Sequence, residues 1–361
     1  MNAPERQFAS QQKPGLLAPP LTLAQLQQFD TIIDVRSPAE FAEDHLPGAI
    51  NLPVLSNQER IEVGTLYKQS SAFEAKKVGA ALVARNIAAH IDAAMRDKPR
   101  NWKPLIYCWR GGSRSGAMAH ILRSIGWGAL QLEGGYKAWR GQVIRELEQL
   151  PARFEYRVIC GRTGSGKSRL LEAMAADGHQ VLDLEKLAAH KGSVLGDLPD
   201  EPQPSQKMFE SSIWLALSHF SSARPVYVEA ESKRVGVLRV PESLMQHMRQ
   251  SECHEVQTPP VLRVRLLREE YAHLIANPSR LFAKLDCLKE LHSGERIAAW
   301  KALAVQHRWD EFVADMLEHH YDPAYEKSMF RNYVKAQSAT PLRVNEIDHG
   351  DFAMLAATLP A

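Results

Sequence analysis

The strongest constraint on the fold is a glycine-rich turn, GRTGSGKS, at residues 161–168. The apolar run FEYRVIC (154–160) precedes this turn, and a helix is predicted from about Lys167 to Ala176. Glycines allow the backbone to wrap tightly, so that several amides face one anion, and the helix adds the positive end of its dipole. A strand, a phosphate-binding turn and a helix in this order predict an α/β domain with a parallel sheet.

The turn matches the Walker A pattern in the strand-to-helix setting that this pattern requires. Lys167 supplies a charge to the terminal phosphates, and Ser168 can ligate Mg²⁺. The loop binds a diphosphate or a triphosphate without reading a base, so the sequence leaves open whether the ligand is a nucleotide. The residues predicted to bind phosphate are Gly161, Arg162, Thr163, Gly164, Ser165, Gly166, Lys167 and Ser168.

Further apolar runs extend the alternation of strands and helices. TIIDV (31–35), QVLDL (180–184) and PVYVEAE (225–231) each predict a buried strand. The third of these runs offers Glu229 or Glu231 as an acid near the phosphates, in the position where such domains more usually carry Asp.

A second strand-loop-helix unit lies earlier in the chain and carries a cysteine. The run PLIYC (104–108) ends at Cys108, and a loop with two glycines leads into a predicted helix. Converging amides, the helix dipole and two arginines all favour the charged thiolate, and they also make a cradle for an anion. Cys108, Arg110 and Arg114 are therefore the predicted catalytic residues. The predicted anion-binding loop consists of Trp109, Gly111, Gly112 and Ser113.

The sequence around this loop resembles the rhodanese family. DVRSPAEF (34–41) followed by HLPGAINLP (45–53) is similar to the N-terminal signature of that family, and LEGGYKAW (132–139) is similar to the C-terminal one. The resemblance implies that Cys108 is a nucleophile that carries sulfur or selenium. It also implies that Asp34 and Arg36 brace the loop rather than take part in the chemistry.

One departure from the common sulfurtransferase loop concerns its length. Arg114 lies six positions after Cys108, and this spacing resembles that of cysteine phosphatases and of rhodanese-fold phosphatases. A longer loop makes a wider cradle, which suits a tetrahedral anion or selenium. A cysteine phosphatase is therefore an alternative, although the sequence offers no clear general acid for a leaving alcohol.

The length of the chain, 361 residues, predicts two domains at about 100–200 residues per domain. We expect a rhodanese-like domain at 15–145 and a P-loop domain at 146–361, joined through a charged helical stretch at 140–152. Beyond Glu269 the pattern is helical, and Pro323 is expected to break it. The predicted fold class is α/β: a rhodanese-like domain with a parallel sheet, then a P-loop NTPase-like domain with a helical C-terminal extension.

Composition narrows the setting of the protein rather than its activity. The net charge of +2 neither demands nor excludes nucleic acid. Four scattered cysteines form no C-x-x-C pair, which fits a reducing compartment, and no His or Cys spacing predicts a metal site. The first twenty residues look like a loose tail rather than a signal peptide, and no apolar run is long enough for a membrane. A cytoplasmic location is expected.

A rhodanese-like domain followed by a P-loop domain is a rare pairing, and the chain resembles the tRNA 2-selenouridine synthase family from about residue 15 to 335. The two loops carry most of this resemblance. Further support comes from HKGS (190–193), PSQKMFE (204–210), VEAES (228–232) and HYDPAY (320–325).

This resemblance implies a transferase that modifies the thiolated wobble uridine of tRNA. The family geranylates the sulfur with geranyl diphosphate and then replaces the S-geranyl group with selenium from selenophosphate. Carried over, the loop at Lys167 would hold the diphosphate, and Cys108 would carry a perselenide stabilised by Arg110 and Arg114. No tightly bound cofactor is expected, Mg²⁺ is compatible, and an enzyme that makes selenophosphate is a candidate partner.

The sequence alone carries only a faint sign of tRNA. Six basic residues could contact phosphates, although a solvated face is the simpler interpretation: Lys233, Arg234, Arg239, Arg263, Arg265 and Arg268. Two more alternatives remain, a persulfide sulfurtransferase fused to a nucleotide-dependent switch and a non-catalytic anion-binding protein. The sequence does not identify the apolar slot that a geranyl chain would need.

Overall fold

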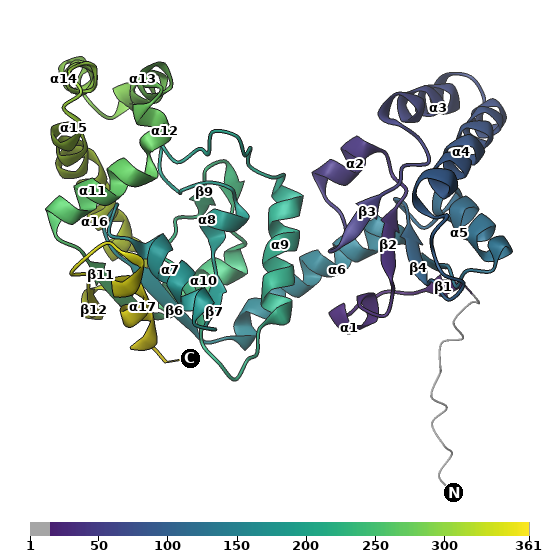
Figure 1. The fold of residues 1–361 in the computed structure, drawn as a ribbon, viewed down its shortest axis with the longest axis horizontal. Coiled ribbons are helices and arrows are strands. Elements are labelled where there is room, and N and C mark those ends of the chain that lie inside the picture. Colours follow the sequence, from purple (N-terminus) through teal and green to yellow (C-terminus); the bar gives the residue numbers. More distant parts are fainter. Residues whose placement is uncertain (1–14, 361) are drawn as a thin grey trace, which may run out of the picture. The chain divides into compact units, whose positions relative to one another are not determined.

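The computed structural model describes residues 15–360 and divides the chain into two compact units, Met1–Arg145 and Glu146–Ala361 (Figure 1). The loose N-terminal tail expected from the sequence falls mainly on residues 1–14, outside the described residues. Within the described part, no helix has the length and apolar character needed to cross a bilayer.

The first unit is built on a sheet of five parallel strands in the order β1-β5-β4-β2-β3. β4, which leads into the cysteine loop, lies in the middle of this sheet and is buried along its whole length. The strands are β1 (Leu16–Leu17), β2 (Thr31–Asp34), β3 (Ala49–Asn51), β4 (Pro104–Tyr107) and β5 (Leu130–Leu132).

The helices of this unit supply the apolar side chains that cover the sheet. Ile87 from α4 and Met118 and Leu122 from α5 pack with Ile33 and Ile106 of the central strands in one core cluster. The helices are α1 (Leu23–Leu26), α2 (Pro38–Glu43), α3 (Asn57–Gln69), α4 (Ala72–Ala94), α5 (Ser113–Ile125) and α6 (Gly135–Gln149).

The second unit has its own parallel sheet of five strands, in the order β12-β11-β6-β8-β7. The strand order reverses beside β6, and ligands of open α/β sheets bind at the carboxyl ends of the strands at such a point. The glycine-rich turn follows β6 there. The strands are β6 (Tyr156–Cys160), β7 (Gln180–Leu182), β8 (Val226–Glu229), β11 (Glu252–Gln257) and β12 (Thr340–Arg343).

Around this sheet lie α7 (Lys167–Ala176), α8 (Leu184–Leu187), α9 (Gln206–His219), α10 (Glu242–Gln250) and α17 (His349–Ala357), with a short ribbon of β9 (Arg234–Val235) and β10 (Leu238–Arg239). A helical part follows β11. It contains α11 (Pro260–Glu270), α12 (Ala272–Ile275), α13 (Pro278–Asp286), α14 (Gly294–Val305), α15 (Trp309–Met316) and α16 (Asp322–Asn332). The predicted α/β class with parallel sheets is confirmed.

The expected break at Pro323 is wrong. A π-helical turn, Leu317–Tyr321, joins α15 directly to α16, and Pro323 lies in the first turn of α16. The hydrogen bonding widens to the π-helical pattern directly before Pro323, where the Asp322 N–H donates to the carbonyl of Leu317, and this local change accommodates a residue that has no N–H. The chain therefore continues as a helix past the residue at which the sequence pattern suggests a stop.

The C-terminal helix α17 supports the glycine-rich turn from behind. Gly166 has φ of +90°, and a Cβ built on it would lie 2.5 Å from Cζ of Phe352. Phe352 is 1% exposed and packs in one cluster with Ile159 of β6 and Leu170 of α7. The ring thus fills the space that a side chain at position 166 would need.

We predict that Phe352→Ala destabilises the second unit by about 3–5 kcal/mol, because it removes a buried ring and leaves a cavity behind the turn. Urea unfolding followed by circular dichroism measures this change. Met354→Ala, on the same helix but 66% exposed, is the matched control and should cost little. An equal loss in both variants would contradict this role of Phe352.

Candidate functional site

Cys108 lies at the carboxyl end of β4, is 3% exposed and has one polar side chain in contact with its sulfur. The hydroxyl of Ser115 donates a hydrogen bond to Sγ at 3.1 Å. Nε2 of Gln131 donates to Oγ of Ser115 at 2.9 Å and to the carbonyl of Gly111 at 2.6 Å. Gln131 therefore orients the hydroxyl toward the sulfur. Sequence reasoning assigned no role to Ser115 or Gln131, which lie outside the predicted set.

The cysteine loop crosses the turn after β5 at backbone contact. Gly111 has φ of +62°, and a Cβ on it would lie 2.4 Å from the carbonyl oxygen of Leu132. A Cβ on Gly135 would lie 2.2 Å from the carbonyl oxygen of Cys108. The amides of Tyr136 and Lys137 donate to the carbonyls of Cys108 and Trp109, both at 2.9 Å. These contacts leave no room for a side chain at position 135, the second glycine of the LEGGYKAW segment.

A buried ion pair holds the same turn from the other side. Arg36 donates to both carboxylate oxygens of Asp34, and its guanidinium carbon lies 4.0 Å from the ring centre of Tyr136. The Tyr136 hydroxyl donates to Asp44 at 2.8 Å. Burial, together with Asp44, raises the pKa of Tyr136, so its phenol remains a proton donor. Asp34 and Arg36 thus brace the turn that contacts Cys108.

The two arginines of the loop differ in their surroundings. Arg114 is mostly buried and pairs with Glu40 at 2.9 Å, while Arg110 is exposed. Burial alone would raise the pKa of Glu40, but the Arg114 guanidinium outweighs it and the pKa of Glu40 is lowered. The sequence predicted that the charge of Arg114 serves the sulfur. In the structure, an anion entering the loop has to compete with Glu40 for it.

We predict that Ser115→Ala slows the alkylation of Cys108 by iodoacetamide by roughly 10- to 100-fold, because a hydrogen bond to a charged group contributes roughly 1.5–3 kcal/mol. Peptide mass spectrometry separates Cys108 from Cys160, Cys253 and Cys287. Ser124→Ala, on the same helix α5 but bonded only to the carbonyl of His120, is the control. Unchanged alkylation in Ser115→Ala would show that the hydroxyl does not stabilise the reacting sulfur.

In the second unit, side chains donate hydrogen bonds to three carbonyls of the glycine-rich turn. Nζ of Lys167 donates to the carbonyl of Gly161 at 3.0 Å. Arg263 donates to Thr163 at 2.9 and 2.8 Å. The hydroxyl of Thr258 donates to the carbonyl of Ser165 at 2.7 Å. With these three carbonyls engaged, they are not free to repel an anion that binds at the turn.

A cavity of about 370 Å³ lies over this turn. It brings together five of the predicted phosphate-binding residues: Thr163, Gly164, Gly166, Lys167 and Ser168. Residues of three segments quoted above also line it, including Lys191, Glu229 and Tyr321. Arg162 is placed differently, since it pairs with Glu326 at 2.5 Å and with Asp322 at 3.5 Å and lines another cavity.

Three carboxylates meet beside Lys167. One oxygen from each of Glu185, Glu229 and Glu231 lies within 4.8 Å of the others. Nζ of Lys167 lies 3.3 Å from Glu229, and Ser168 donates to Glu185 at 3.2 Å. Both acids predicted from the sequence are here, whereas Glu185, at the start of α8, was not predicted.

This cluster has the donor set that Mg²⁺ prefers. The sequence offered Ser168 as a Mg²⁺ ligand and Glu229 or Glu231 as a nearby acid, but it predicted no complete metal site. All the side chains offer hard oxygen atoms, and Oε2 of Glu229 is buried with no hydrogen-bond partner. A divalent cation fits the cluster, with Ser168 as a further oxygen ligand.

Burial, reinforced by the neighbouring carboxylates, raises the pKa of Glu185 to about 10 and that of Glu231 to about 8. Burial also raises the pKa of Glu229, against the opposing charge of Lys167. At neutral pH these carboxyls therefore retain protons that a cation must displace.

We predict that Mg²⁺ binding releases roughly one to two protons and tightens as the pH rises from 6 to 9, because metal ligands must be deprotonated. The sign follows from the raised pKa values, since protons compete less as the pH approaches them. Calorimetry in buffers of different ionisation enthalpy measures the release. Glu231→Gln should reduce it, whereas Glu270→Gln, in the same cavity but bonded to Lys191, is the control. Binding that does not depend on pH would contradict the assignment.

Of the six basic residues that could contact tRNA phosphates, one is buried and five are exposed. Arg263 is 4% exposed and is tied to Asp322 and to the turn, so it braces the phosphate loop and does not contact phosphates. Arg265 and Arg268 are exposed and pair with Glu269 and Asp310. The remaining three are also exposed: Lys233, Arg234 and Arg239.

Comparisons with known proteins match both units. Residues 20–142 match the rhodanese-like domain, and residues 154–340 match the tRNA 2-selenouridine synthase AAA domain. The chain is 34% identical over 331 residues to a tRNA 2-selenouridine synthase of Alcanivorax borkumensis, covering 83% of this chain and 90% of that protein. A similarly named protein of Sulfurovum sp. is 31% identical over 83% of this chain and 89% of the relative. For Nitrosomonas europaea the identity is 37%, over 66% of this chain and 63% of the relative.

Proposed function

The chain belongs to the tRNA 2-selenouridine synthase family, and from this premise we propose that it is a cytoplasmic transferase that converts the 2-thiouridine at the wobble position of tRNA into 2-selenouridine. The proposal divides the work between the two loops. The loop at Lys167 serves S-geranylation by geranyl diphosphate, and the loop at Cys108 serves the exchange of sulfur for selenium. The observation that carries the proposal is that one chain holds both a cysteine loop, with Ser115 bonded to Cys108, and a glycine-rich turn whose Lys167 lines a cavity.

The geometry of the second unit supports the prenyl-transfer step. Transfer forms a bond between the uridine sulfur and the first carbon of the geranyl group, while the bond from that carbon to the diphosphate breaks. Lys167 and the amides of the turn would stabilise the charge that grows on the departing pyrophosphate. A divalent cation bound at the glutamate cluster would neutralise more of that charge.

The selenium step would use Cys108 as a carrier of selenium donated by selenophosphate. Forming a perselenide joins two fully reduced atoms, so two electrons must leave, and phosphorus can accept them by departing as phosphite. The terminal selenium then attacks carbon 2 of the base and expels geranylthiolate. Two equivalents of a thiol, oxidised together to a disulfide, finally supply the two electrons that cleave the sulfur–selenium bond, release the product and restore the Cys108 thiolate. Ser115 and the loop amides support this role because each can stabilise a negative chalcogen.

The products offer a direct check on this route. If selenophosphate attacks carbon 2 itself and Cys108 only binds it, water later cleaves the selenium–phosphorus bond and phosphate appears. Phosphorus NMR of a single turnover separates the two outcomes. Phosphite supports the perselenide, and phosphate as the only product excludes it.

We predict that Cys108→Ala abolishes selenation and leaves geranylation intact, whereas Lys167→Ala slows geranylation by roughly 10²–10³-fold through lost electrostatic stabilisation. Mass spectrometry of nucleosides from thiolated tRNA, incubated with each donor in turn, measures both steps. Lys186→Ala is the control for Lys167, since Lys186 is exposed on the neighbouring helix α8. If Cys108→Ala and Lys167→Ala lost the same single step, the proposed division of work between the two loops would be contradicted.

A further inference from the structure

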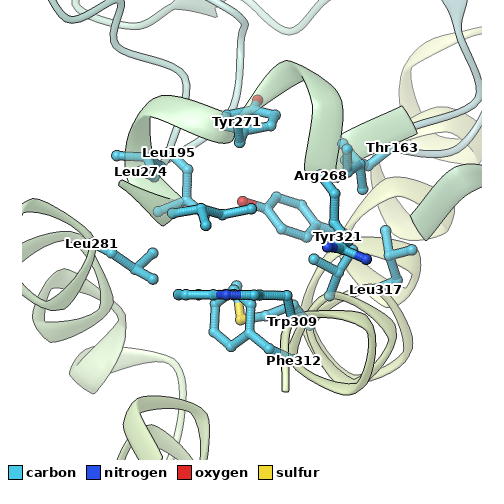
Figure 2. A pocket seen from close by; sticks show the side chains of 14 residues that line it. Thr163, Leu195, Arg268, Tyr271, Leu274, Leu281, Trp309, Phe312, Leu317 and Tyr321 are labelled. Carbon is cyan, nitrogen blue, oxygen red and sulfur yellow. The ribbon is translucent and has the colours of Figure 1, made fainter. Parts of the chain in front are cut away.

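An apolar slot opens beside the phosphate cavity in the second unit (Figure 2). Four residues line both spaces, so the two adjoin: Thr163, Leu267, Tyr271 and Tyr321. Thr163 belongs to the glycine-rich turn itself, and its place at one end of the slot is visible in Figure 2. The slot thus begins where the phosphate-binding turn ends.

The walls of the slot come from the helical part between α11 and the π-helical turn. Trp309 and Phe312 of α15 form one wall, and Leu274 and Tyr271 lie across the space from them (Figure 2). Leu281 closes a side. All five side chains are large, and the four apolar ones belong to a core cluster that is separate from the core of the sheet.

Two polar groups at the edge of the slot, the Tyr271 hydroxyl and the Arg268 guanidinium, already have partners. The hydroxyl of Tyr271 lies 3.3 Å from Oγ of Ser193. The guanidinium of Arg268 donates to Asp310 at 2.7 Å, so the aliphatic stem of Arg268 is what the slot offers a ligand. A base or a sugar would therefore lose hydrogen bonds to water on entering, whereas a hydrocarbon would lose none.

The slot is also small. Its volume is about 50 Å³, compared with about 370 Å³ for the phosphate cavity. By this measure one water needs roughly 10–15 Å³, so the slot has room for several atoms of a hydrocarbon chain but not for a nucleoside.

We propose that this slot receives the isoprenoid chain of the prenyl diphosphate whose diphosphate is bound at Lys167. The inference rests on the proposed prenyl transfer and adds the binding site for the hydrocarbon. A diphosphate over the turn and a chain between Trp309 and Tyr271 place the reacting carbon at the junction of the two spaces. That junction is lined by Thr163 and Tyr321.

The size of the effect follows from the burial of hydrocarbon. Each methylene moved from water into an apolar site strengthens binding by about fourfold. Several carbons in the slot should therefore make geranyl diphosphate bind at least about tenfold more tightly than inorganic pyrophosphate, even after the cost of ordering the chain.

The test fills the slot and compares two ligands in the absence of tRNA. Val313→Trp and Ile275→Trp each add a large side chain at a lining position that is only partly buried. Val305→Trp, on α14 and 65% exposed, is the matched control. Calorimetry measures the affinity of each full-length variant for geranyl diphosphate and for inorganic pyrophosphate. We expect the two slot variants to lose the preference for geranyl diphosphate while pyrophosphate binds as in the unaltered protein.

Retained pyrophosphate binding also shows that a variant is folded. If a slot variant binds neither ligand, the fluorescence of Trp309 in the unaltered protein tests whether the chain enters the slot. Geranyl diphosphate, but not pyrophosphate, should change the emission, and Trp309→Phe should remove that change. Emission that does not respond to geranyl diphosphate would overturn the proposal that the slot binds the isoprenoid chain.

The outcomes separate this inference from the proposed function. If the unaltered protein prefers geranyl diphosphate and the slot variants keep that preference, the chain does not bind in the slot. The proposed prenyl transfer would still stand. If the unaltered protein transfers no geranyl group and binds both ligands equally, the proposed function fails as well.

Discussion

Both loops depend on one constraint, which is that the backbone carbonyls near an anion must be bound by the protein itself. Gln131 holds the carbonyls of Gly111 and Gly112 beside Cys108. Lys167, Arg263 and Thr258 hold those of the turn in the second unit. An unsatisfied carbonyl pointing into either cradle would repel the charge that the cradle is built to accept. Each site therefore relies on side chains from other elements as much as on its own glycines.

Much of this arrangement follows from local sequence. The strands at both loops and the helix Lys167–Ala176 lie where the apolar patterns predict them, because strand, turn and helix signals are contiguous there. β11 was not predicted, since Glu252, His254 and Gln257 give its short sequence a polar character. Glu185 was missed for a different reason. Its place beside Glu229 depends on β7 and β8 being neighbours, which no single segment reveals.

Charged residues show the same limit of sequence reasoning. The spacing of Arg114 from Cys108 indicated a charge for the sulfur, yet its nearest carboxylate, Glu40, lies far away in the sequence on α2. From the sequence, Arg263 was expected to be a cation on a solvated face. In the structure it is buried against Asp322. Both arginines lie where their charge is matched by an acid, because an unpaired buried charge is too costly to keep. A sequence displays the charge but not its partner.

The burial of Cys108 has a consequence for the lifetime of the enzyme. Peroxide oxidises an exposed thiolate first to sulfenic acid and then to sulfinic acid. The second oxidation is irreversible in most proteins. With only 3% of Cys108 exposed, an oxidant in solution has little access to its sulfur. The exposed Cys287 has no such protection. Under oxidative stress, damage should therefore accumulate first at Cys287.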